Sequence, residues 1–61
     1  MNKQYLLSMT KEDFNAKVLC EGFDAVVAAA KILGVNIEGQ DRWAATKTVY
    51  DAWLALEAEG K

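Results

Sequence analysis

The feature that most constrains this chain is that Cys20 is its only cysteine and that its 61 residues include no histidine. A domain of this size buries only about 60% of the surface that its unfolded chain exposes, so a disulfide or a structural zinc ion often supplements the core. One cysteine without histidine provides neither of these supplements. The chain must therefore fold through efficient packing of its large apolar side chains, or through self-association. We expect Cys20 to be a small buried apolar residue.

The composition indicates a folded protein and argues against two classes of partner. Hydrophobic residues make up 52% of the chain, charged residues 26%, and proline is absent, which is typical of a globular domain. Seven basic and nine acidic residues give a net charge of −2, without the basic excess of most nucleic-acid-binding proteins. No apolar run approaches the roughly 18 residues of a membrane span. We expect one domain over residues 1–61, cytoplasmic and without a membrane partner.

The first strong local signal is a helix start at Thr10. A threonine can cap a helix, two acidic residues follow in the first turn, and Met9 and Phe14 have the spacing of a hydrophobic staple. Gly22 then favours a break in the chain. These features predict a helix over residues 10–21.

The second predicted helix, residues 23–33, has the sequence FDAVVAAAKIL. Its alanines favour helix formation, and apolar residues surround almost its whole circumference, which is typical of a buried central helix. Gly34 has the position of a left-handed helix terminator, and Val35 follows as the apolar residue that packs back on the last turn. We expect the next residues to form a loop held by Val35 and Ile37.

The third predicted helix covers residues 41–59, with Asp41 as its N-cap. Its apolar residues span an arc of roughly 180°, which is wider than one neighbouring helix covers. This helix therefore lies in a groove between the other two, or it keeps an uncovered strip for a partner. Its aromatic residues are typical of a core, but an aromatic residue at the edge of a core often anchors a protein interface. The candidate protein-binding residues are Trp43, Tyr50, Trp53 and Leu54.

Together these segments predict an all-α fold, a small three-helix domain (about 10–21, 23–33 and 41–59) with an N-terminal arm. For the arm, an extended segment, a short helix and a loose end are all compatible with its sequence. We favour an ordered arm, because leaving each large apolar side chain of residues 5–9 in water forgoes about 1.5–3 kcal/mol.

The sequence offers no constellation typical of an enzyme. Cys20 has no histidine to activate it, the adjacent acidic residues are explained as helix-terminal and surface charges, and the glycines lack the spacing of a phosphate-binding loop. We therefore predict no catalytic, cofactor-binding or metal-binding residues, and no cofactor.

Residues 24–43 carry a different pattern. A small Ala29 allows close helix crossing, Gly34 allows a left-handed turn, Val35 fills the corner and Asn36 can cap a following helix. This segment, which ends in Arg-Trp, resembles the helix-turn-helix of phage repressor proteins of the Cro and CII type. The resemblance implies a recognition helix after Asn36, and its candidate nucleic-acid-binding residues are Asn36, Gln40, Arg42 and Lys47. The alternative is that Gly34 only ends one helix and that Asp41 caps the next.

Three functions follow from these patterns. We favour a non-enzymatic protein-binding module, a small accessory or inhibitory protein of the kind found in phages and bacteria, which binds a larger protein through residues 43–56 and the loop at 35–42. The alternative is a helix-turn-helix transcriptional regulator that binds DNA as a dimer. The third is an assembly subunit that oligomerises through its helices, for example as a homodimer.

Overall fold

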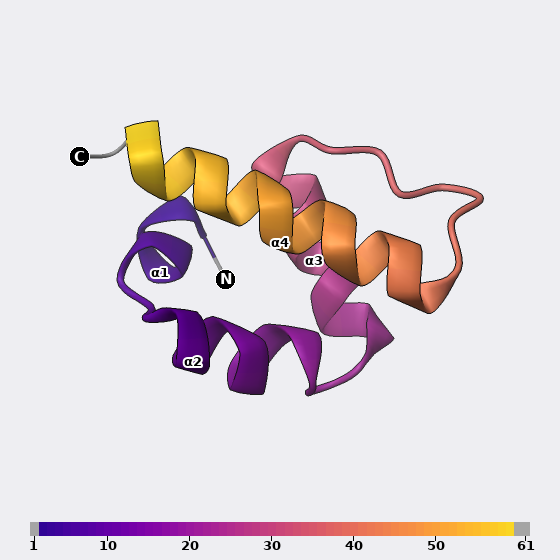
Figure 1. The fold of residues 1–61 in the computed structure, drawn as a ribbon, viewed down its shortest axis with the longest axis horizontal. Helices are drawn as coiled ribbons and strands as arrows, with labels where there is room; N and C mark the ends of the chain where they lie inside the picture. The colour runs from indigo at the N-terminus through magenta and orange to yellow at the C-terminus, as the bar shows by residue number, and fades with distance from the viewer. Residues whose placement is uncertain (1, 60–61) are drawn as a thin grey trace.

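The longest helix, α4 (Arg42–Glu59), forms one side of the molecule, and the other helices pack along it (Figure 1). A computed structural model describes residues 2–59. In chain order the preceding elements are α1 (Lys3–Leu7), α2 (Lys11–Phe14), the π-helical segment η1 (Asn15–Leu19) and α3 (Phe23–Leu33). Because the described residues form helices and loops without strands, the predicted all-α fold is confirmed.

The N-terminal arm is a short helix, which was one of the three alternatives. The Asn2 side chain caps α1 by accepting from the Tyr5 N–H at 2.8 Å. Leu6 is fully buried and Met9 nearly so, whereas Tyr5 and Leu7 remain exposed. The arm therefore contributes to the core mainly through two of its apolar residues.

The helix predicted over residues 10–21 begins as expected but changes its winding. The Thr10 hydroxyl accepts from the Asp13 N–H at 3.1 Å, which confirms the cap. From residue 15 the chain is π-helical, and the Cys20 N–H donates to the Asn15 carbonyl five residues earlier at 2.8 Å. In an α-helix Leu19 would lie about 140° around the axis from Phe14. A wider π turn rotates each residue less, so Leu19 lies with Phe14 in the core.

The expectation that Cys20 is buried is wrong. Val18 and Leu19 occupy the core-facing positions at the end of η1, and Cys20, the next residue, is exposed. Its thiol lies 3.8 Å from the Asn15 side-chain oxygen.

The helix α3 has the predicted bounds but not the predicted burial. Gly34 ends it in the left-handed conformation, with φ at 74°, and the Val35 N–H donates to the Ala30 carbonyl at 3.0 Å. Only Val26, Ala29 and Ala30 are buried, because α3 packs on α4 and η1 through one face. The helix is therefore peripheral, and its other apolar residues are partly exposed.

The loop after α3 is held at both ends. The Gln40 N–H donates to the Ile37 carbonyl at 3.1 Å, across a turn in which Gly39 has a φ of 81°. The residues after Asn36, where the resemblance implies a recognition helix, form this turn, and α4 begins at Arg42. Asp41 caps α4, since its carboxylate accepts from the Ala44 N–H at 2.8 Å.

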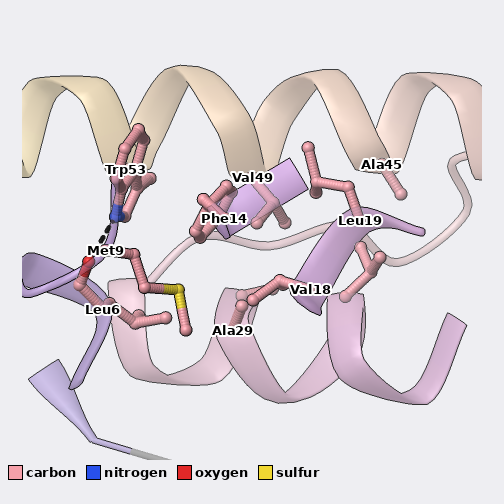
Figure 2. Packing of buried hydrophobic residues seen from close by; sticks show 11 residues of the cluster. Leu6, Met9, Phe14, Val18, Leu19, Ala29, Ala45, Val49 and Trp53 are labelled. Atoms are coloured by element: carbon pink, nitrogen blue, oxygen red, sulfur yellow. Dashed lines mark hydrogen bonds between the residues drawn. The ribbon is translucent and has the colours of Figure 1, made fainter. Parts of the chain in front are cut away.

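The centre of the core is a stack of two aromatic rings (Figure 2). The rings of Phe14 and Trp53 lie 4.4 Å apart and are nearly parallel, and both residues are fully buried. The Trp53 indole N–H donates to the Leu6 carbonyl at 2.7 Å, which attaches α1 to α4. The remaining buried core residues are apolar: Met9, Val18, Leu19, Val26, Ala29, Ala30, Ala45 and Val49.

Candidate protein-binding site

Trp43, in the first turn of α4, is the most exposed large apolar side chain among the described residues. It leaves 86% of its surface accessible, compared with 45% for Tyr5 and 41% for Phe23. It lies about 160° around the helix axis from Ala45, the nearest residue of the buried row of α4.

Trp43 borders an open groove of about 580 Å³ between α4 and the segment formed by α2 and η1. One wall is a continuous face of α4, since its residues follow the i, i+3, i+4 and i+7 spacing. A second hollow of about 490 Å³ adjoins it and adds Arg42 and Cys20. We call this surface the Trp43 groove; its main part is lined by Lys11, Glu12, Asn15, Leu19, Trp43, Thr46, Lys47 and Tyr50.

The floor of the groove is continuous with the core. Leu19 is 9% exposed, and Tyr50 is half-buried. The centre of the Tyr50 ring lies 6.1 Å from that of Trp53 and 6.2 Å from that of Phe14. A partner side chain placed there would contact apolar groups that the core already holds in position. The groove is therefore a preformed site for apolar side chains.

The rim of the groove has the opposite charge to the chain as a whole. Lys11, Lys47 and Arg42 line it with one acid, Glu12, although acids outnumber bases in the complete sequence. Trp43 also lies between two of these cations along α4. The site thus combines an apolar floor, an exposed aromatic ring and a basic rim.

The structure divides the predicted protein-binding residues. Trp43 and Tyr50 line the groove together. Trp53 is fully buried and uses its indole N–H within the core, so its side chain is not part of the exposed surface. Leu54 is half-buried against the core and does not line the groove. The opposite wall, including Asn15 and Leu19, could not be predicted from the sequence, because the placement of α2 and η1 beside α4 depends on tertiary packing.

The residues proposed for nucleic-acid binding lie in two places. Arg42 and Lys47 belong to the Trp43 groove. Asn36 and Gln40 line a separate hollow between α3 and the following loop. Both loop side chains make local hydrogen bonds: Asn36 accepts from the Glu38 N–H at 2.9 Å, and Gln40 accepts from the Thr48 hydroxyl at 3.0 Å.

Residues 2–59 contain neither a metal-binding cluster nor a membrane-spanning helix. No group of three or more histidine, cysteine or acidic side chains is placed to bind a metal ion there. None of the described helices has the length and apolar character needed to cross a membrane.

Comparisons with protein-family models, curated proteins and solved structures give no match to this chain.

Proposed function

We propose that this chain is a non-enzymatic protein-binding module that binds a larger protein through the Trp43 groove and thereby modulates or inhibits it. The observation that carries the proposal is the 86% exposure of Trp43 beside a groove floored by Leu19 and Tyr50. Tryptophan is enriched among the residues that dominate the binding energy of protein interfaces.

The energetics of the exposed indole support this function. Burying a large apolar side chain is worth about 1.5–3 kcal/mol, and Trp43 gains little of this in the isolated chain. A partner that covers the indole ring recovers this free energy of burial. The open shape of the groove also favours a protein surface over a small molecule, because small-molecule sites enclose most of their ligand.

A photo-crosslinking experiment tests the proposal. A photoreactive phenylalanine analogue replaces Trp43 in one variant and Asp51, which is exposed in the middle of α4, in a matched control. Both are expressed in the cells that naturally make the chain, irradiated and analysed by mass spectrometry. We expect one protein to be crosslinked from position 43 and not from position 51. Equal crosslinking from both positions, or none, would contradict the proposal.

The helix-turn-helix alternative stays a prediction of the sequence, and a separate measurement tests it. A DNA-binding regulator retards random duplex DNA at low salt, and this retardation falls steeply as salt rises. If Arg42→Ala abolishes such retardation, the alternative gains support over the protein-binding proposal.

A further inference from the structure

We infer that the partner presents an acidic amphipathic helix to the Trp43 groove. This inference rests on the proposed function and adds the chemistry of the bound segment. Its first support is charge: the groove and its adjoining hollow hold three of the chain's seven bases and one of its nine acids. A local basic rim on an acidic protein attracts an acidic partner and repels a basic one.

The rim cations are available to a partner. Among residues 2–59, no hydrogen bond to a protein acceptor is made by the side chains of Lys11, Arg42 or Lys47. All three residues are exposed. Carboxylates on a bound segment can therefore pair with them without displacing an existing contact.

The shape of the groove indicates a helical segment. Along α4 the wall runs from Trp43 to Tyr50, about 10 Å, which corresponds to two turns of a bound helix. Apolar side chains at i, i+3 or i+4, and i+7 of that helix would face Leu19, Trp43 and Tyr50. Strand addition has no support, because residues 2–59 contain no strand edge to extend.

A peptide-display selection tests the inference without knowledge of the natural partner. A library of 18-residue helical peptides, with the charge and apolar positions randomised, is selected in parallel on the native protein and on Trp43→Ala. Because Trp43 makes little contact with the rest of the chain, the variant should fold, which circular dichroism checks. We expect peptides enriched only on the native protein to combine apolar residues at helical spacing with an excess of Asp and Glu.

The outcomes separate the two proposals. If Trp43-dependent peptides are enriched but are neutral or basic, the acidic-helix inference is overturned and the protein-binding function stands. If no peptide is enriched in a Trp43-dependent manner, the acidic-helix inference is overturned, and the crosslinking experiment alone decides the protein-binding function. Enriched acidic peptides that lack apolar helical spacing would also overturn the inference, because they would bind by charge alone.

Charge-reversal variants test the basic rim directly. For an enriched acidic peptide, Lys11→Glu with Lys47→Glu should weaken binding roughly tenfold, with the loss diminishing as salt rises. The matched control, Lys3→Glu with Lys31→Glu, makes the same change in net charge at exposed lysines outside the groove. Equal weakening by both pairs would mean that total charge, not the rim, determines binding, and would overturn the inference.

Two other occupants of the groove, a second copy of this chain and a nucleic acid, are tested by separate measurements. Sedimentation of the native protein over a concentration series would reveal a Trp43-dependent dimer, which would assign the groove to a second copy of this chain. In a second measurement, a labelled single-stranded oligonucleotide competes with the selected peptide. If the oligonucleotide displaces the peptide and protects Cys20 from alkylation, the groove is assigned to nucleic acid instead. Either result overturns the acidic-helix inference, whereas protection of Cys20 by the acidic peptide supports it.

Discussion

The two tryptophans of α4 have opposite environments although they lie ten residues apart on one helix. Trp53 is fully buried, stacks on Phe14 and donates to the Leu6 carbonyl, whereas Trp43 exposes 86% of its surface. Ten residues correspond to a rotation of only about 80° around the axis. The short helix α1 contacts α4 and covers Trp53 through Leu6 (Figure 2), whereas the high exposed fraction of Trp43 means that the described residues leave it largely uncovered.

One helix therefore carries a buried tryptophan that stabilises the fold at one end and an exposed tryptophan, the anchor of the proposed binding surface, at the other. A domain of this size has a free energy of unfolding of about 3–9 kcal/mol, so a single aromatic core contributes a large share. Trp53 fills that core, whereas Trp43 contributes little to it.

Trp53→Ala should have the largest effect. Removing a buried aromatic side chain costs about 3–5 kcal/mol, through lost burial and the cavity that remains. It also removes the stacking on Phe14 and the indole hydrogen bond to the Leu6 carbonyl, which keeps only the longer bond from the Met9 N–H. We expect the variant to be largely unfolded at 25 °C by circular dichroism and urea titration. A stability within 1 kcal/mol of the native protein would contradict the described core.

Trp53→Phe separates the ring from its hydrogen bond. The phenyl ring can still stack on Phe14, but the Leu6 carbonyl loses its indole donor and keeps only the Met9 N–H at 3.3 Å. We expect this loss to cost about 0.5–1.5 kcal/mol, in addition to the cost of the space that the smaller ring leaves unfilled. Since that carbonyl belongs to α1, we expect the substitution to accelerate amide hydrogen exchange more in residues 3–9 than in α3. Uniform acceleration across the chain would instead indicate that the hydrogen bond does not specifically hold α1.

Asp41→Ala acts at the end of α4 that carries Trp43. The Asp41 carboxylate accepts from the Ala44 N–H, and loss of such a cap costs about 1 kcal/mol. Hydrogen exchange should accelerate at residues 42–45 and stay unchanged around Trp53. Asn36→Ala is the control, because Asn36 accepts from the Glu38 N–H within the loop and caps no helix. A larger effect of the control would show that the loop, not the cap, fixes the start of α4.

Much of the fold could be predicted because its signals are local. Thr10 and Asp41 cap helices as their side chains allow, and Gly34 ends α3 in the left-handed conformation that favours glycine. The π-helical winding of Asn15–Leu19 had no local signal. It was therefore missed, and the burial of Cys20 was predicted wrongly.

The candidate site was only half predictable for a related reason. A wheel of residues 41–59 gives a wide apolar arc but not the buried row within it, which runs through Ala45, Val49 and Trp53. Only packing against α1 and α3, together with the stack of Trp53 on Phe14 of α2, selects that row, and this selection leaves Trp43 outside it. The opposite wall of the groove, with Lys11 and Leu19, depends on the same long-range packing.

Trp43→Ala should have the smallest effect on stability and the clearest effect on fluorescence. A substitution at an exposed position is expected to change the free energy of unfolding by at most about 0.5 kcal/mol, measured by urea titration. In the native protein, iodide should quench the exposed Trp43 and leave the buried Trp53 largely unquenched. The variant should therefore emit at shorter wavelength and resist iodide almost completely. Strong quenching in the variant would place Trp53 in contact with water, and the contrast between the two ends of α4 would then fail at its buried end.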